Sequence, residues 1–168
     1  MTEQQRYTVV DELGNDPQIE LREYPSCTVA DVVVQGSVER AANAGFGPLV
    51  SYISGHKLAM TAPVLQEPAS GNESWLVSFV LPGAELPSAY PLPTDGRVSL
   101  RELPAHRALA LRWSGRWTAH TLARRTKELL AAAANAGLVP VGEVRWARYD
   151  PPWTPPFMRR NEVIVTVA

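Results

Sequence analysis

The chain has 168 residues, of which 45% are hydrophobic and 20% charged, a composition typical of a soluble globular protein with a sizeable core. Its net charge of −1 argues against nucleic acid as the main partner, and no apolar run reaches the length of a membrane span. The single Cys27 excludes an internal disulfide, and the lack of a CxxCH motif excludes covalent haem attachment. A reducing, cytoplasmic location is therefore expected.

Two segments of the chain match each other at an offset of 79 residues. Residues 19–25 correspond to 98–104, and the match continues without a gap to Gly36 and Gly115. Each copy has the pattern of a strand, a proline turn and a second strand that ends at the glycine. Such an ungapped match predicts an internal structural repeat.

A first helix is expected over residues 37–54, where apolar side chains recur at helical spacing. Ser37 is the expected N-cap of this helix. Pro48 lies inside the pattern, so a kink or a helix in two pieces is expected, with Pro48 opening the second piece. Alternatively, Gly45 allows another part of the molecule to approach the helix backbone closely.

A second helix is predicted between Thr118, its N-cap, and Gly137, its end. Two further strands are expected after each helix, which gives roughly eight strands in all. These strands are residues 59–65 and 75–81 in the first half, and residues 144–149 and 162–167 in the second.

The elements together predict an α+β fold. Residues 19–81 and 98–167 form two βαββ units related by a pseudo-two-fold axis, within a single domain that spans residues 1–168. A groove is expected where the two units meet.

The connection between the last two predicted strands is rich in prolines and aromatic residues. Four prolines restrict the backbone of residues 149–161 and hold Trp153 and Phe157 on a stiff loop. Arg159 and Arg160 follow, in a half of the chain (residues 85–168) where 12 basic and 7 acidic side chains give a balance of +5. This combination suits a flat, apolar, anionic ligand. Two alternatives are a packed loop whose aromatics fill a core edge, and a PxxP docking ligand.

Several motifs make the chain resemble the SOUL haem-binding family, from about residue 7 to 167. They are MTAPV at residues 60–64, VSFV at 77–80, SGRW at 114–117, YDPP at 149–152 and RRNE at 159–162. The resemblance implies a twisted antiparallel β-barrel made of two repeats and flanked by two helices. It also implies that a tetrapyrrole, either haem b or protoporphyrin, binds noncovalently in a groove between the first helix and the loop before the last strand.

The resemblance and the loop together predict the ligand-binding residues. They are Leu49, Tyr52, Ile53, His56 and Lys57 from the first helix and its end, and Trp153, Phe157, Met158, Arg159 and Arg160 from the loop. Arg159 or Arg160 is expected to bind a propionate, with Lys57 as a second contact.

Axial ligation of iron is the point at which the chain departs from part of the family. A histidine proposed as axial ligand in some members would follow Arg22, but Glu23 stands there. His56 is the remaining candidate, and iron is expected to add little to the affinity. In-strand ion pairs between Arg22 and Glu23, and between Arg101 and Glu102, are the expected role of those two acids.

The predicted function is that of a tetrapyrrole carrier or buffer. The chain has no GxSxG, Walker or GxGxxG motif and no nucleophile–base pair, so no enzyme activity is predicted. The sequence indicates no nucleic-acid partner and no membrane span, and specifies no protein partner. The alternatives are a domain of the effector-binding kind for other flat small molecules, or a hydrolase on that fold.

Overall fold

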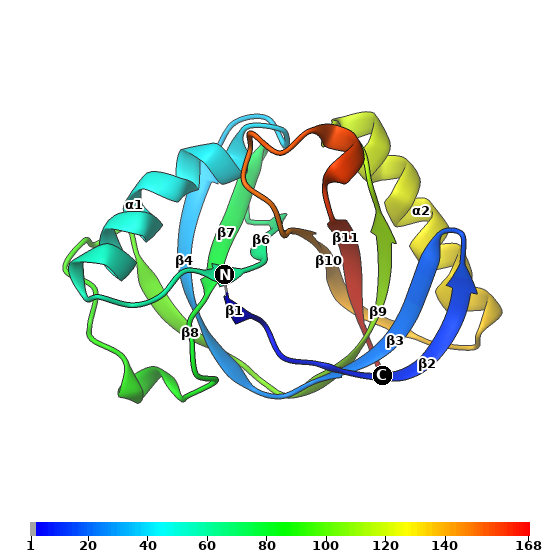
Figure 1. Ribbon diagram of the computed structural model, residues 1–168, viewed down its shortest axis with the longest axis horizontal. Helices are drawn as coiled ribbons and strands as arrows, with labels where there is room; N and C mark the ends of the chain where they lie inside the picture. Colours follow the sequence, from blue (N-terminus) through cyan, green and yellow to red (C-terminus); the bar gives the residue numbers. More distant parts are fainter. Residues whose placement is uncertain (1–2) are drawn as a thin grey trace. The chain divides into compact units, whose positions relative to one another are not determined.

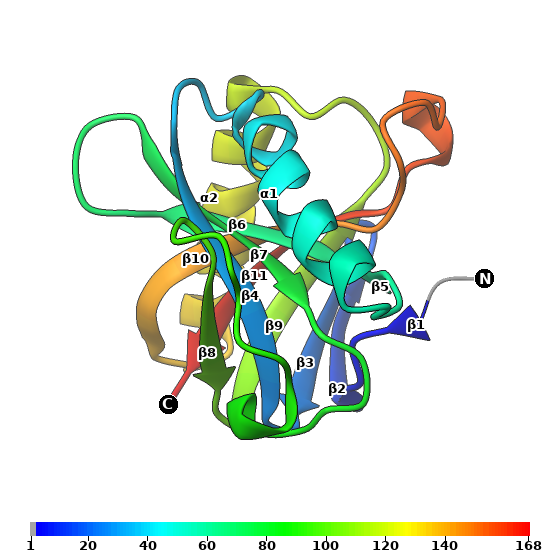
Figure 2. The same cartoon turned by 90° about the vertical axis from the view of Figure 1, so that its left-hand side faces the viewer.

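The computed structural model describes residues 3–168, which divide into two compact units (Figures 1 and 2). Unit 1 contains the N-terminal residues through Arg6 and Pro25–Ala105, and unit 2 contains Tyr7–Tyr24 and His106–Ala168. Each unit has one long α-helix packed on antiparallel strands. The predicted α+β class is therefore confirmed.

Unit 1 is built on four antiparallel strands in the order β8-β4-β7-β6. A short parallel pair, β1 with β5, adds to these strands. The helix α1 packs on β4, β7 and β6. The elements of unit 1 are β1 (Glu3–Gln4), β4 (Cys27–Gln35), α1 (Ala41–Gly55), β5 (Thr61–Ala62), β6 (Val64–Pro68), β7 (Ser74–Val80), the 3₁₀ helix η1 (Pro87–Ala89) and β8 (Ser99–Leu103).

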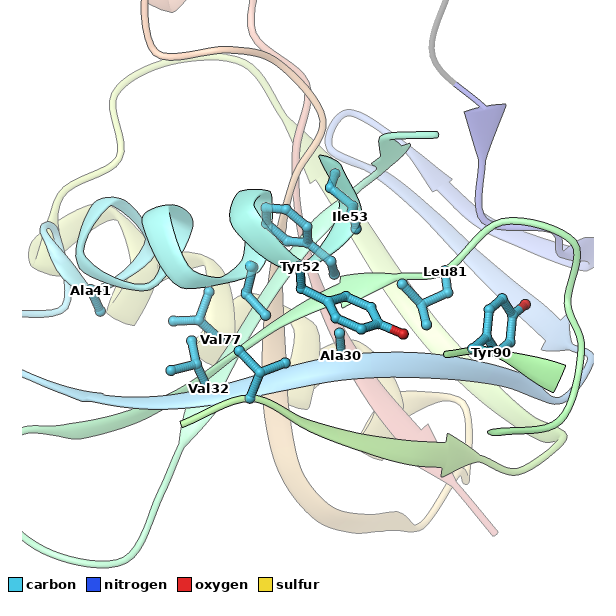
Figure 3. Packing of buried hydrophobic residues seen from close by; sticks show 11 residues of the cluster. Ala30, Val32, Ala41, Tyr52, Ile53, Val77, Leu81 and Tyr90 are labelled. Carbon is cyan, nitrogen blue, oxygen red and sulfur yellow. The ribbon is translucent and has the colours of Figure 1, made fainter. Parts of the chain in front are cut away.

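The core of unit 1 forms where α1 meets its strands (Figure 3). Leu49, Tyr52 and Ile53 project from one side of the helix, as i, i+3 and i+4 spacing requires, and are buried in this core. The Tyr52 hydroxyl donates a 2.7 Å hydrogen bond to the carbonyl oxygen of Pro91. The buried hydroxyl is therefore satisfied within its own unit.

The helix α1 differs from its prediction in two respects. It begins at Ala41 rather than at Ser37, because the Ser37 carbonyl accepts hydrogen bonds from the amides of Arg40 and Ala41 in a turn before the helix. No side chain caps it, so the predicted Ser37 cap is wrong. Pro48 lies within one continuous helix, so the division into two pieces is also wrong; the packing of its buried face outweighs the lost hydrogen bond.

The structure supports the alternative prediction for Gly45, in which another part of the molecule approaches the helix backbone closely. A Cβ atom at this position would lie 3.0 Å from side-chain atoms of Val32 on β4 and Val77 on β7. The glycine thus allows α1 to approach its own strands closely.

Unit 2 has five antiparallel strands in the order β2-β3-β9-β11-β10, with α2 packed on β9, β10 and β11. The predicted N-cap of the second helix is confirmed, since the Thr121 amide donates to the Thr118 hydroxyl at 3.1 Å. The elements of unit 2 are β2 (Thr8–Asn15), β3 (Gln18–Tyr24), β9 (His106–Trp113), α2 (Ala119–Asn135), β10 (Pro140–Arg148), the 3₁₀ helix η2 (Pro156–Met158) and β11 (Asn161–Val167).

The strand count exceeds the predicted eight. The described residues contain eleven strands: β1 and β2 were not predicted, and the expected strand 59–65 is divided at Pro63 into β5 and β6. β2 has exposed side chains and two register shifts against β3, which is why it lacks the alternation that marks a half-buried strand.

The strand registers inside the two units correspond at the offset of 79. Leu21 on β3 lies opposite Leu109 on β9, and Leu100 on β8 lies opposite Ala30 on β4. In the predicted repeat, β3 and β8 are the first strands and β4 and β9 the second strands. Because β3 pairs with β9 and β8 pairs with β4, each compact unit combines strands from both predicted βαββ segments. The boundaries of the units therefore differ from the predicted segments 19–81 and 98–167. Superposition of these two segments and closure of a barrel stay predictions from the sequence.

Candidate functional site

The segment that joins β10 to β11, residues 149–160, carries the most exposed aromatic side chains among the described residues. Trp153 is 82% exposed, Phe157 77% and Met158 62%. The alternative in which these aromatics fill a core edge is therefore wrong. Exposed apolar side chains that lie close together in the chain mark a candidate binding surface. We call residues 149–160 the aromatic loop.

Hydrogen bonds inside unit 2 fix the backbone of the aromatic loop. The amide of Thr154 donates to the Pro151 carbonyl at 3.1 Å, and that of Met158 to the Pro155 carbonyl at 2.9 Å. The amide of Gly115, which follows β9, donates to the Pro156 carbonyl at 2.9 Å. The four prolines add fixed φ angles, so the loop is rigid before any ligand arrives.

The Arg159 guanidinium binds the loop itself. Its Nε donates to the carbonyl oxygen of Thr154 at 2.8 Å, and its Nη2 donates to that of Pro152 at 3.0 Å. These two bonds cross the turn that presents Trp153. The side chain therefore supports the shape of the loop, a role that sequence reasoning missed.

Arg160 ties the end of the loop to the interior of unit 2. Its amide donates to the Asp150 carboxylate at 2.5 Å, and its Nη2 donates to Glu162 at 3.0 Å and to the Tyr7 hydroxyl at 2.9 Å. The guanidinium carbon also lies 3.8 Å from the centroid of the Tyr149 ring. Both ends of the loop are thus held by one arginine.

Glu162 is the centre of this buried ionic cluster. Arg22 binds it bidentately, with both N–O distances 2.7 Å, and Arg160 and the Tyr149 hydroxyl complete its hydrogen bonds. Burial works to raise the pKa of Glu162, but the hydrogen bonds and charges of Arg22 and Arg160 outweigh it and hold the pKa below its usual value. The carboxylate is therefore ionised and fully paired.

The sequence itself carries a signal for this cluster. Glu162 is the single charged residue of the strand Asn161–Val167. A charge inside an otherwise apolar strand implies a buried partner of opposite sign.

The ion pairs of the repeat-related acids differ from those predicted. Arg22 binds Glu20 and Glu162 rather than Glu23, and Glu23 binds Arg107 on the neighbouring strand at 2.8 Å. Arg101 binds Asp31 at 2.7 Å, rather than Glu102. Adjacent residues of a strand point to opposite faces, which is why the in-strand pairs with the next residue do not form.

Arg148 adds a further positive charge where the aromatic loop begins. Its guanidinium carbon lies 4.2 Å from the centroid of the Trp117 ring. Burial, and then the charge of Arg159, lower the pKa of Arg148 to about 10. Repulsion between these two arginines favours an anion beside them.

The predicted residues of the first helix belong to unit 1, whereas those of the loop belong to unit 2. Leu49, Tyr52 and Ile53 are buried against their own strands, so a role for them in lining a groove stays a prediction. The partly buried His56 ring lies 5.1 Å from that of Tyr52. Lys57 is exposed and has a positive φ of 57°, directly after the end of α1.

Two kinds of feature are absent from residues 3–168. No group of three or more His, Cys, Asp or Glu side chains in this range could hold a metal ion. Within the same range, no helix combines the length and the apolar character needed to cross a bilayer.

Comparison with solved structures relates the fold to several proteins of low sequence identity. The C-terminal domain of EcmrR has a TM-score of 0.71 at 15% identity, covering 90% of this chain and 98% of that one. A hydrolase from Listeria innocua has a TM-score of 0.63 at 13% identity, covering 89% and 91% of the two chains. An uncharacterized conserved protein from Listeria innocua has a TM-score of 0.62 at 10% identity, covering 89% and 92%. At these identities the likeness shows the fold alone.

Comparison of the sequence identifies the family. No curated protein matches the chain. The family model of the SOUL heme-binding protein matches residues 2–166, nearly the whole length. This chain therefore belongs to the SOUL heme-binding protein family.

Proposed function

We propose that this protein binds haem or a related tetrapyrrole noncovalently, as a carrier or buffer, and that the aromatic loop makes the main contact in unit 2. The observation that carries the proposal is the exposure of Trp153 and Phe157 on a loop held by its own hydrogen bonds. The family implies such a ligand. The contribution of α1 is a separate prediction from the sequence.

The loop fits the ring of a tetrapyrrole. Burying one aromatic face against a flat apolar ligand contributes about 1.5–3 kcal/mol from the area removed from water. Because Arg159 and the four prolines already fix the loop, binding costs little conformational entropy.

The arginines in and beside the aromatic loop complement the anionic propionates of a tetrapyrrole. They do so by their summed charge, whereas the sequence predicted a direct contact from one arginine. The Nε and Nη2 atoms of Arg159 and Arg160 already donate to carbonyl or carboxylate oxygens of unit 2. A propionate near these arginines would therefore share donors and gain from the summed charge of Arg148, Arg159 and Arg160. This supports electrostatic attraction more than a dedicated bidentate contact.

The main test is a titration of the Trp153→Ala variant with haemin, followed by the Soret absorbance. Affinity should fall by roughly ten-fold or more, because an exposed aromatic contact is lost. The melting temperature should stay nearly unchanged, since the side chain is 82% exposed. The matched control is Leu92→Ala, which removes an equally exposed apolar side chain from unit 1 and should leave the affinity unchanged. Unchanged affinity of Trp153→Ala would place the ligand elsewhere.

The role of iron is tested by metal-free protoporphyrin. It should bind within about a factor of ten of haemin, a difference of roughly 1.4 kcal/mol, because Glu23 stands where the proposed axial histidine would be. His56→Ala should change neither affinity. A hundred-fold preference for haemin that is lost in His56→Ala would instead make His56 the axial ligand.

The alternative functions are a domain for other flat small molecules and a hydrolase. The solved structures support them only through the fold. For a cationic ligand, the buried carboxylate of Glu162 would be the natural counter-charge, but Arg22 and Arg160 already neutralise it. A lipophilic aromatic cation should therefore compete poorly with haemin, and strong competition would favour the alternative.

A further inference from the structure

The tip of the aromatic loop presents apolar surface without a covering element in its unit. Trp153, Phe157 and Met158 lie within six positions and are all more than 60% exposed. In Figure 2 the loop, drawn in orange, extends away from the ends of the two strands β10 and β11 that carry it. Tryptophan is enriched at the interface of a bilayer, because its ring is apolar and has one polar N–H.

Many polar backbone groups of this loop are either missing or bonded within unit 2. Pro151, Pro152, Pro155 and Pro156 have no N–H to desolvate. The carbonyl oxygens of these four prolines and of Thr154 all accept hydrogen bonds from donors within unit 2. Irregular backbone enters an apolar medium only when its polar groups are satisfied internally, and these groups are.

The surroundings of the loop carry a net positive charge. Arg148, Arg159 and Arg160 flank the tip, and the exposed Arg116 follows Gly115, whose amide is bonded to the Pro156 carbonyl. Against these four arginines stand two carboxylates, Asp150 and Glu162, both bonded to Arg160, so the balance is 4 − 2 = +2. Anionic lipid headgroups complement this charge.

We propose that the aromatic loop docks on the surface of an anionic lipid bilayer, with Trp153, Phe157 and Met158 inserted at the headgroup level and Arg116 near the lipid phosphates. The inference stands on the loop itself and does not rest on tetrapyrrole binding. It describes peripheral contact, which is compatible with the lack of a spanning helix among residues 3–168.

The test uses the full chain without tetrapyrrole and vesicles of phosphatidylcholine, with or without phosphatidylglycerol, in a sedimentation assay. Binding should appear on the vesicles that contain phosphatidylglycerol and weaken at high salt. Trp153→Ala should lower the partition coefficient about ten-fold. Arg116→Gln should lower it roughly five-fold. The matched controls Leu92→Ala and Arg97→Gln remove an exposed apolar side chain and an exposed arginine from unit 1, and should bind as the wild type does.

Tryptophan fluorescence gives an independent readout. Trp113, Trp117 and Trp146 are buried and Trp75 is partly buried, so transfer of Trp153 from water to lipid should dominate any change in emission. A blue shift on vesicle addition that is absent in Trp153→Ala supports insertion. Three results would overturn the proposal: equal binding to both kinds of vesicle, binding unaffected by Trp153→Ala, or self-association of the free protein that Trp153→Ala abolishes. Unchanged melting temperatures of the variants show that each result reports binding rather than unfolding.

Discussion

The order β8-β4-β7-β6 in unit 1 matches β3-β9-β11-β10 in unit 2, but the two units differ in the connection between the two strands that follow the helix. In unit 1, residues 69–73 join β6 to β7 as a short polar turn, whereas in unit 2 the aromatic loop joins β10 to β11. The register of β3 with β9 corresponds to that of β8 with β4, so these strand pairs do not explain the difference. The comparison teaches that a similar strand arrangement can carry either a short polar turn or a loop with exposed aromatic side chains.

The same contrast holds for the arginines at equivalent repeat positions. Arg22 in unit 2 is almost completely buried and binds two carboxylates, Glu20 and Glu162. Arg101 in unit 1 also pairs with two carboxylates, Asp31 at 2.7 Å and Glu67 at 3.5 Å, but its side chain is 39% exposed. The buried ionic cluster of unit 2 holds the end of the aromatic loop through Arg160. The ion pairs of Arg101 in unit 1 are more exposed to solvent.

The largest expected effect is the loss of the buried carboxylate of unit 2. Glu162→Ala should lower the free energy of unfolding by about 3–5 kcal/mol, because Arg22 is left buried without its main partner. Asp31→Ala should cost less, about 1.5–3 kcal/mol, because water reaches Arg101. Urea unfolding measures both, with the exposed Glu102→Ala as a control. Equal costs would remove the contrast between the two units.

The pH dependence of stability should follow from the same carboxylate. The pKa of Glu162 is lower in the folded chain than its ordinary value of 4.5, so its contribution is complete above that pH. The contribution is lost as the pH falls from there through the folded pKa. Glu162→Gln should therefore show an acid-side slope shallower by up to about 1.4 kcal/mol per pH unit. Identical slopes in urea titrations of the two proteins would show that Glu162 does not titrate on unfolding.

A smaller effect should separate the starts of the two helices. Thr118→Ala removes the side-chain cap of α2 and should cost about 1 kcal/mol. Ser37→Ala should change the stability by less than about 0.5 kcal/mol, because no side chain caps α1. Thermal unfolding of the two variants measures the difference. A cost at Ser37 equal to that at Thr118 would contradict the assignment of the turn before α1.

The smallest effect concerns the helix ends, which have the same backbone motif with different residues. Leu58 and Leu138 donate to the carbonyls of Ile53 and Ala133, and Lys57 and Gly137 have φ angles of 57° and 72°. Since glycine adopts this conformation without strain, Lys57→Gly should raise the free energy of unfolding by about 0.4–1 kcal/mol. Gly137→Lys should lower it by a similar amount. Changes of the same sign in the two variants would show that the ends are not equivalent.

The sequence by itself determined the elements that depend on local signals. The Thr118 cap and the proline-restricted loop that carries Trp153 followed from capping chemistry and prolines, each of which acts within a few residues. The motifs between residues 60 and 162 were sufficient to indicate the family, which the match over residues 2–166 then confirmed.

Tertiary structure alone decided how distant segments meet. β3 pairs with β9, and β8 pairs with β4. Both pairs join strands from different halves of the predicted repeat, and no local sequence pattern specifies these partners. The partners of Arg160 lie at Tyr7 and Glu162, and packing on β4 and β7 kept α1 continuous through Pro48. These outcomes depend on which side chains burial brings together, because a buried charge must find its counter-charge and a buried face outweighs a lost hydrogen bond.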